Sequence, residues 1–226
     1  LEPVGGARDQ HHERAAMVQK LDFKKTEKYL YQPPAGRFEI IEVPPLPFLM
    51  VDGAGSPNEE GPFHEALQAL YGVSYTLKFT SKKEPGIDYT VLPLEALWYV
   101  PGKAIFELVD EDPSAWQWTA MIRQPEHISP EMVEQAIASA RARHPSAALD
   151  RLRLERFHEG LSVQTMHIGP YSAEAPTINA MHVFMKEQGL DPAGKHHEIY
   201  LGDPRTSAPE KLRTVLRQPA RRALCG

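Results

Sequence analysis

Cysteine is nearly absent from this 226-residue sequence, and its one copy, Cys225, comes just before the C-terminal glycine. A single cysteine cannot form a disulfide within the chain, and so low a cysteine content is typical of a reducing compartment. The N-terminal stretch is polar and lacks the apolar core of a secretory signal peptide. We therefore expect a cytoplasmic protein.

Long apolar runs and an excess of basic charge are also missing. The stretch 43–51 is interrupted by three prolines and is far shorter than the roughly 20 apolar residues that cross a bilayer. The chain has 25 basic and 30 acidic residues, mixed along its length, and a net charge of −5. Because it offers no broad basic face to phosphates, we expect neither a membrane nor nucleic acid as a partner.

The common signatures of cofactor and metal enzymes are missing as well. There is no Gly-Lys-Ser/Thr phosphate loop and no Gly-x-Ser-x-Gly elbow, and Gly53-Ala54-Gly55 lacks the third glycine of a dinucleotide loop. The ten histidines include no His-Glu-x-x-His pair, and the adjacent His196 and His197 would point to opposite faces of a strand. We expect no cofactor and no metal site.

What the sequence does contain is a mixture of helical and extended patterns. Pro62 begins a stretch with helical spacing that ends near Phe79, and Ser129-Pro130 is a typical start for a second helix, which ends near His144. A third helix is expected at about 175–188. Strands are expected at about 38–43, 48–51, 88–92, 94–99, 115–123, 152–157, 161–167, 196–201 and 212–217.

Internal duplication is the strongest sign of organisation. The motif Arg-Gln-Pro occurs at 123–125 and again at 217–219, and each copy follows a strand, a glycine turn, a long helix and further strands. We expect an α+β fold built from pseudo-repeats at about 37–125 and 150–219. Two such β-α-β-β units can share one antiparallel sheet, with both helices on one face and a central ligand groove on the other.

Glu198 is the candidate for chemistry in that groove. Period-two geometry places His196, Glu198 and Tyr200 on one face of their strand, and the more apolar face with His197 and Ile199 should lie against the helices. A carboxyl group in an aromatic groove would have a raised pKa and could act as a base, or it could pair with a cationic ligand. The alternative is that Glu198 is an ordinary surface carboxylate exposed to solvent.

Aromatic side chains supply the rest of the expected pocket. Trp116 and Trp118 share a strand face, and Tyr71 and Tyr75 share a helix face. Any one of these rings would more often belong to the core, but together they suit a planar polycyclic ligand. The aromatic candidates are Trp98, Trp116, Trp118, Tyr71, Tyr75 and Tyr171.

The run Lys195-His-His-Glu-Ile-Tyr-Leu-Gly-Asp-Pro-Arg205, together with His167-Ile-Gly-Pro-Tyr171, resembles the stand-alone GyrI-like small-molecule-binding proteins. The resemblance covers about residues 20–220. It implies a duplicated β-α-β-β (SHS2-type) module at 37–220, preceded by a flexible leader and N-terminal arm at 1–36 and followed by a tail at 221–226. It also implies that Glu198 faces the ligand, with His167, His196 and Tyr200 among its contacts.

The resemblance leaves several functions open. Regulators of this kind carry a DNA-binding helix-turn-helix, for which residues 1–36 are too short and too polar, and gyrase-inhibiting relatives are shorter. Other stand-alone members hydrolyse cyclopropane-bearing DNA alkylators of the duocarmycin and yatakemycin type, which makes drug resistance the favoured function. Glu198 would then be the general base and Tyr71 or Tyr171 the proton donor. A non-catalytic multidrug-binding or effector-binding protein is the alternative, and either could be a monomer or a homodimer.

Overall fold

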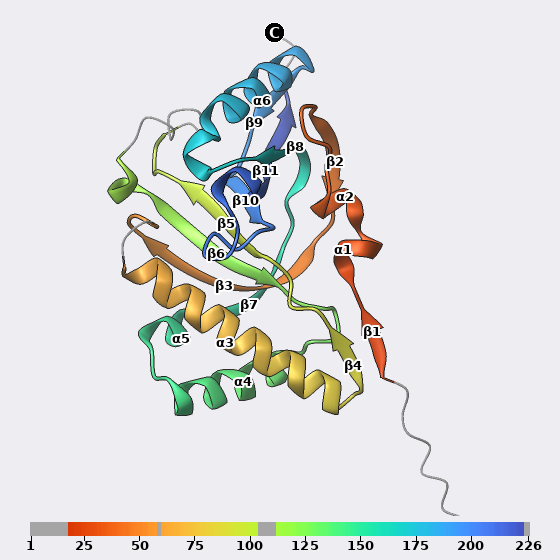
Figure 1. Cartoon of the computed structure of the whole chain (residues 1–226), viewed down its shortest axis with the longest axis vertical. Helices are drawn as coiled ribbons and strands as arrows, with labels where there is room; N and C mark the ends of the chain where they lie inside the picture. Colours follow the sequence, from red (N-terminus) through yellow and green to blue (C-terminus); the bar gives the residue numbers. More distant parts are fainter. Residues whose placement is uncertain (1–17, 58–59, 104–111, 224–226) are drawn as a thin grey trace, which may run out of the picture.

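The computed structural model describes residues 18–57, 60–103 and 112–223 (Figure 1). The helices are α1 (Phe23–Thr26), α2 (Lys28–Tyr31), α3 (Pro62–Lys83), α4 (Pro130–Arg143), α5 (Ala147–Arg151) and α6 (Ala175–Glu187). The strands are β1 (Gln19–Leu21), β2 (Glu39–Val43), β3 (Leu46–Ala54), β4 (Ile87–Tyr89), β5 (Leu94–Tyr99), β6 (Gln117–Arg123), β7 (Arg153–Phe157), β8 (Gly160–Ile168), β9 (Leu190–Pro192), β10 (His196–Tyr200) and β11 (Arg213–Arg222). None of the helices within these ranges is long and apolar enough to cross a bilayer.

The large antiparallel sheet has the strand order β2-β8-β11-β10-β5-β6-β3-β7, with β9 beside β11. Outward from its centre, β5, β6 and β3 on one side match β10, β11 and β8 on the other. The outermost strands are exchanged, because β2 of the first half pairs with β8 and β7 of the second half pairs with β3. This symmetric order supports the proposal that the two halves are repeats.

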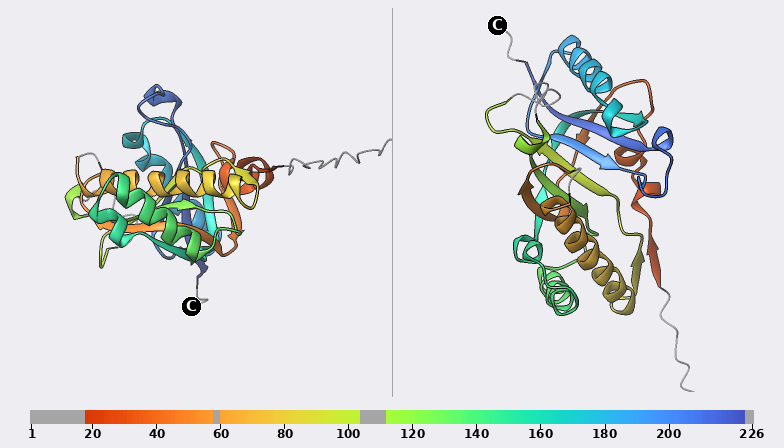
Figure 2. Two further views of the ribbon diagram at one scale, coloured as in Figure 1. Left: turned by 90° about the horizontal axis from the view of Figure 1, so that it is seen from below. Right: turned by 60° about the vertical axis from the view of Figure 1, so that its left-hand side comes forward.

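The long helices of the two expected repeats, α3 and α6, lie on one face of this sheet (Figures 1 and 2). Leu70, Val73 and Leu77 of α3 pack in one cluster with the sheet side chains of Ala96 and Ala120. On α6, the apolar side chains of Ile178, Met181 and Met185 pack against β8 and β11. The α+β architecture expected from the sequence is therefore confirmed, with both helices on the same face.

The opposite face is covered by a short N-terminal arm, which we define as residues 19–31. Leu30 and Tyr31 are 1% and 2% exposed and belong to a second apolar cluster that also contains Met121, Ile199 and Val215. Ile199 therefore packs under the arm. The sequence had predicted that it would pack under the helices, and that expectation is wrong. Because successive strand residues alternate, Glu198 lies on the helix face, and the expectation that this side chain would lie on the helix-free face is wrong.

The repeated Arg-Gln-Pro motif has a physical role on the arm side. Arg123 pairs with Glu27 and donates a hydrogen bond to the Tyr31 hydroxyl at 3.2 Å. Arg217, its counterpart on β11, donates to the Leu30 carbonyl oxygen at 2.7 Å. Both arginines are buried and hold the same arm from two different strands.

Most expected elements are present, with several changes of length. The helix expected to end near Phe79 continues to Lys83, and the strand expected at 88–92 shrinks to the three residues of β4. The expected tail at 221–226 begins inside a strand, because Arg221 and Arg222 of β11 pair with β9. The leader at 1–17 and Cys225 lie outside the described residues.

Candidate functional site

Glu198 lies on β10, at the centre of the sheet, on the face that carries α3 and α6. It pairs across the strands with Ala96 on one side and Leu216 on the other, so three strands form the floor around it. His196 and Tyr200 share its face, as period-two geometry predicts. The Glu198 side chain is 15% exposed, which leaves it reachable from solvent but largely enclosed.

A hydrogen-bonded chain fixes the Glu198 carboxylate. The Tyr200 hydroxyl donates to Glu198 Oε2 at 2.7 Å, and Trp98 Nε1 donates to the Tyr200 hydroxyl oxygen at 2.9 Å. Burial, and then the charge of Glu198, raises the pKa of Tyr200 well above that of a free phenol, so its proton stays in place. His196 Nε2 lies 3.5 Å from the other carboxylate oxygen, Oε1. Trp98, Tyr200 and His196 therefore all belong to the site.

Two further tyrosines stand at the rim. The Tyr171 ring packs edge-on against Tyr200 with ring centroids 5.5 Å apart, and Tyr171 is 38% exposed. Burial, followed by the charges of Glu174 and Glu198, raises the pKa of Tyr171 to about 12. Burial also raises the pKa of the half-buried Tyr71, which lies close enough to Tyr171 to influence it. Both candidate proton donors thus keep their protons near neutral pH.

The three tryptophans lie in or against the apolar cluster beneath α3. Trp98 contacts Phe63 and Trp116, with ring centroids 5.4 Å and 5.5 Å away, and is itself 5% exposed. Trp118 is fully buried, and a Cβ placed on Gly53 would come within 2.2 Å of its ring, so this glycine is needed for the indole to fit. Trp118, which was expected to line the groove, is therefore a core side chain on the same sheet face as Trp98.

Two other expected ligand contacts lie at the margins. Tyr75 is 48% exposed and stacks between Tyr71 and Phe79 in a row along the outside of α3, with ring centroids 6.5 Å and 6.4 Å away. His167 is buried beside α6, where its Nδ1 lies 3.2 Å from the Thr177 hydroxyl. Both residues border the site more than they form its floor.

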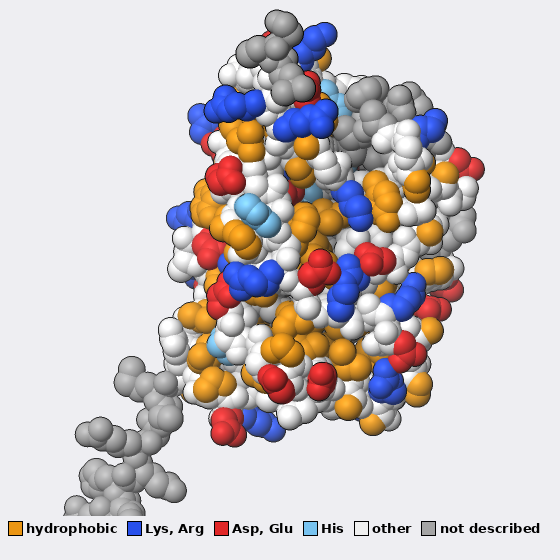
Figure 3. Space-filling model, turned by 180° about the vertical axis from the view of Figure 1, so that it is seen from behind, with side chains coloured by type: hydrophobic (Ala, Val, Ile, Leu, Met, Phe, Trp, Pro, Cys, Tyr) orange, Lys and Arg blue, Asp and Glu red, His pale blue; other side chains and the backbone are white. Residues whose placement is uncertain are grey.

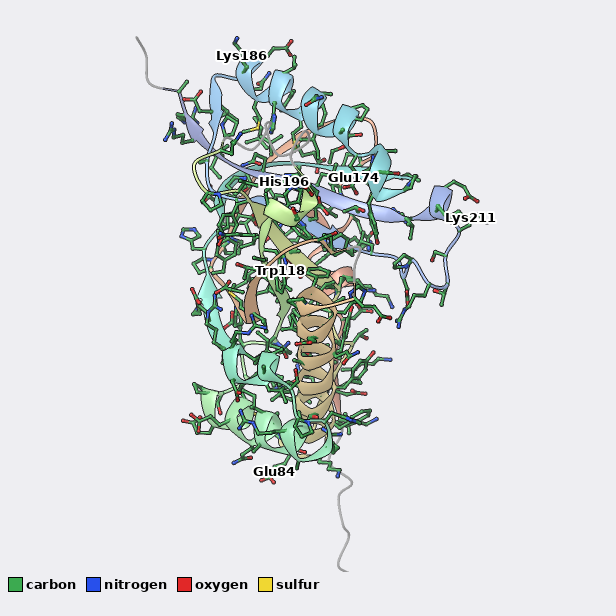
Figure 4. All side chains as sticks on the ribbon, turned by 90° about the vertical axis from the view of Figure 1, so that its left-hand side faces the viewer. Glu84, Trp118, Glu174, Lys186, His196 and Lys211 are labelled. Atoms are coloured by element: carbon green, nitrogen blue, oxygen red, sulfur yellow. The ribbon has the colours of Figure 1, made fainter. Side chains whose placement is uncertain are left out.

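Glu174 is a site residue that the sequence analysis missed. It precedes α6 and is only 4% exposed, and its Oε1 has no hydrogen-bond partner among the described residues. Burial, and then the nearby charge of Glu198, raises the pKa of Glu174 to about 9, so it is neutral at pH 7. Figure 4 labels both Glu174, just before α6, and His196, on β10. Glutamate is common at the start of a helix, so the sequence alone did not mark Glu174 as a site residue.

A second missed feature lies on the arm side of the sheet, in a buried ion network of His197, Glu95, Glu159 and Arg217. The two His197 ring nitrogens lie 2.9 Å from Glu95 Oε2 and 2.9 Å from Glu159 Oε1, and Arg217 donates to Glu159 at 3.1 Å. Burial alone would lower the pKa of His197, but the two carboxylates outweigh it and raise that pKa to about 9. His197 is therefore a fixed cation between two anions.

Charge elsewhere is mixed. On the side of the molecule seen in Figure 3, acidic and basic side chains are interspersed with apolar ones and no broad patch of one sign forms. In the described ranges, no group of three or more His, Cys, Asp or Glu side chains is placed to hold a metal ion.

What the site around Glu198 offers is one carboxylate, one neutral carboxyl group, phenols and indole rings. That set suits acid–base chemistry on, or binding of, a flat ligand.

Comparison with known proteins shows a recognised domain in the second half of the chain. The family model of the GyrI-like small molecule binding domain matches residues 119–221, which include α6 and β10 and most of β6 and β11. No curated protein matches the chain.

Solved structures with the same fold include close relatives. An uncharacterized conserved protein from Listeria innocua is 43% identical, with a TM-score of 0.80, over 89% of this chain and 100% of its own. A hydrolase from Listeria innocua is 42% identical, with a TM-score of 0.79, over 90% of this chain and 100% of its own. The EcmrR C-terminal domain, at 10% identity and a TM-score of 0.52 over 83% of this chain and 98% of its own, shares the fold alone.

Proposed function

The chain belongs to the GyrI-like small-molecule-binding family, and from this we propose that it binds planar hydrophobic or cationic molecules around Glu198 and hydrolyses cyclopropane-containing DNA alkylators. Such hydrolysis would protect a cell from these drugs. The observation that carries the proposal is a carboxylate fixed by Tyr200 at 2.7 Å, on a floor that includes Trp98. The Listeria relative described as a hydrolase, at 42% identity, supports a hydrolytic rather than a purely binding role.

The surroundings of Glu198 suit a general base. Tyr200 holds one carboxylate oxygen, and the other, 3.5 Å from His196 Nε2, is the one that would take a proton from water. Trp116 is only partly buried, so its ring offers surface on which a planar ligand can stack, whereas Trp98 is 5% exposed and anchors the Tyr200 hydroxyl. A base must be positioned before its pKa matters, and the chain from Trp98 through Tyr200 provides that positioning.

The reaction can be written with its atoms and electrons balanced. The water oxygen bonds to the ring methylene carbon of the cyclopropane, and the ring carbon–carbon bond breaks. The electron pair of that bond moves to the dienone carbonyl oxygen of the drug, while the water proton goes to Glu198. Tyr71 or Tyr171 donates a proton to the oxygen as it becomes negative. The proton on Glu198 then returns, through solvent, to the tyrosine that gave one up. The sum is the addition of one water, which uses up the electrophile.

Glu198→Gln tests the assignment, because the amide keeps the shape but cannot take the proton. We expect catalytic amounts of wild-type protein to convert excess drug to a product heavier by one water, and Glu198→Gln to be slower by about 10²–10⁴-fold. The readout is mass spectrometry of the drug over time. Glu134→Gln on the exposed side of α4 is the matched control and should keep the wild-type rate. A Glu198→Gln rate close to wild type contradicts the mechanism.

Sequestration without turnover is the second candidate, favoured by the acidic residues Glu198 and Glu174 among aromatic rings. A cation held there would be protected without being changed. Stoichiometric protection of the drug with no hydrated product supports this candidate. Tyr71→Phe and Tyr171→Phe in the same assay identify the proton donor, since only a donor should lower the rate of product formation.

A further inference from the structure

Three aromatic rings form a row along the outer side of α3. Tyr71, Tyr75 and Phe79 are spaced four residues apart, so they lie on one face of the helix. Neighbouring ring centroids are 6.5 Å and 6.4 Å apart, and the ring planes are inclined to each other by only 29° and 30°. Rings that are nearly parallel to one another present a surface on which another flat ring can stack.

The exposure of these rings increases along the row. Tyr71 is partly buried against the apolar cluster beneath α3, whereas Tyr75 is 48% and Phe79 is 56% exposed. Among the described residues, the other exposed aromatic side chains are Tyr29 on the arm and Tyr171 at the rim of the site. Apolar ring surface in water is unfavourable, and several such rings side by side mark a binding surface.

The inner end of the row reaches the site around Glu198. The Tyr71 hydroxyl is within hydrogen-bonding reach of the Leu94 backbone on β5. Two residues along that strand, Ala96 pairs with Glu198, and continuing this antiparallel register places Leu94 opposite Tyr200. Tyr71 and Tyr200 also pack against the same apolar cluster. The row therefore begins at the rim of the site and runs outward along α3.

The charges along α3 indicate which flat molecules the row would take. Between Glu65 and Glu84 the helix has no acidic residue, so the row has no carboxylate of its own with which to attract a cation. Its cations next to Phe79 are already used, because Lys78 and Lys82 both pair with Asp88. Stacking is what remains, and it suits a neutral aromatic molecule.

We propose that Tyr71, Tyr75 and Phe79 form an outer stacking surface, which captures neutral planar aromatic ligands and passes them along α3 to the site around Glu198. The proposal rests on the ligand-binding part of the proposed function, and it adds an entry route and a neutral ligand class. Stacking on one or two exposed rings is weak, so the ligand moves on. Such a surface changes how fast a ligand arrives and leaves, and not how tightly the inner site holds it.

Stopped-flow fluorescence tests the route with Nile red, a neutral planar dye that brightens in apolar surroundings. With protein in excess, the association and dissociation rate constants of Tyr75→Ala/Phe79→Ala should each be about fivefold lower than those of wild type, with little change in affinity. Tyr29→Ala removes a ring that is 47% exposed on the arm, so it is the matched control and should keep both rate constants. Unchanged rate constants in the double variant overturn the proposal. Weaker binding with faster release also overturns it, because the rings would then belong to the inner site.

Fluorine NMR observes the outer surface directly. In protein that contains 3-fluorotyrosine, the signals of Tyr75 and Tyr29 are assigned by their absence from Tyr75→Ala and Tyr29→Ala. Caffeine, which is neutral and planar, should shift the Tyr75 signal and leave the Tyr29 signal in place, and cyclohexanol, which is not flat, should shift neither. A Tyr75 signal that caffeine does not move overturns the proposal.

The outcomes also separate this proposal from the proposed function. Nile red that fails to bind wild type contradicts both. Drug hydrolysis by wild type, together with unchanged Nile red rate constants in the double variant, leaves the proposed function standing and overturns the entry route alone. Sedimentation velocity tests the other occupant of such a row, a second copy of this chain. A wild-type dimer that the double variant converts to a monomer would make the row a subunit interface and overturn the proposal.

Discussion

His197 and Glu198 are adjacent in the chain, yet they occupy opposite electrostatic settings. His197 points to the arm side, where it is a cation enclosed by Glu95 and Glu159. Glu198 points to the helix side, where it accepts a hydrogen bond from Tyr200 and has no lysine or arginine partner among the described residues. One strand thus separates a buried ion network from a carboxyl group held by a phenol.

His197→Leu should therefore reduce the free energy of unfolding strongly. Removing the cation leaves Glu95 unpaired and Glu159 with Arg217 alone in a buried setting, which costs about 3–5 kcal/mol. Urea denaturation at pH 7 measures the loss. His158→Leu is the control, because that side chain is 59% exposed, and its effect should stay within about 0.5 kcal/mol. Equal effects of the two substitutions would contradict the role of the network.

The same comparison has a defined pH dependence. The pKa of folded His197 is raised to about 9, so its stabilising contribution is complete below about pH 6.5, the ordinary histidine value, and is lost as the pH rises through about 9. The gap between wild type and His197→Leu should consequently narrow between about pH 6.5 and about pH 9 and change little above that. A gap that widens with rising pH would show that His197 is not the charged member.

Sequence patterns predicted which residues share a face but not which face the helices cover. His196, Glu198 and Tyr200 lie together, as alternation requires. In sequence the face of β10 with His197 and Ile199 is the more apolar one, but it packs under the arm, which is apolar as well, so hydrophobicity alone could not tell which layer covers it. Trp98 and Trp118 likewise share a face and belong to one core cluster, which their spacing in the sequence did not reveal.

At the scale of elements, length decided what the sequence could predict. The helices α3, α4 and α6 have enough turns for a periodic pattern, and Ser129 caps α4 by accepting from the Met132 amide, as expected. The helices α1 and α2 have four residues each and no period of their own. They are held by tertiary contacts to Arg123 and Arg217 that are remote in sequence, so local propensity did not reveal them.

The arm should matter for stability through its buried side chains alone. Leu30→Ala removes a side chain that is 1% exposed beneath the sheet and should cost about 2–5 kcal/mol. Tyr29→Ala, one residue earlier and 47% exposed, should change stability by less than about 0.5 kcal/mol. Thermal or urea unfolding of the two variants provides the comparison. A Leu30→Ala protein that is as stable as wild type would show that the arm does not contribute to the stability of the fold.

At the scale of the whole molecule, exchange of the outer strands binds the two halves together. The sheet is continuous through β5 and β10, and each half also lends its first strand to the other. The sequence suggested a shared sheet from the repeated motif and the order of elements. It could not suggest the exchange, because strand pairing over such separations leaves no local pattern.

Residues 37–125 and 150–219, expressed separately, should therefore not fold. Each fragment would expose the strand edge that its partner normally covers, as well as the apolar face on which the arm lies. Circular dichroism and cooperative thermal unfolding provide the measurement, with the full chain as control. A fragment that unfolds cooperatively by itself would contradict this interdependence.

The exchanged strand β2 also affects how the protein is made. Glu39 of β2 pairs with Gln164 of β8, so β2 leaves the ribosome long before its neighbour exists. At roughly 5–20 residues per second, the nascent chain waits on the order of ten seconds with that edge uncovered. The N-terminal half is then most exposed to aggregation during translation, and the demand on chaperones should fall once β8 has emerged.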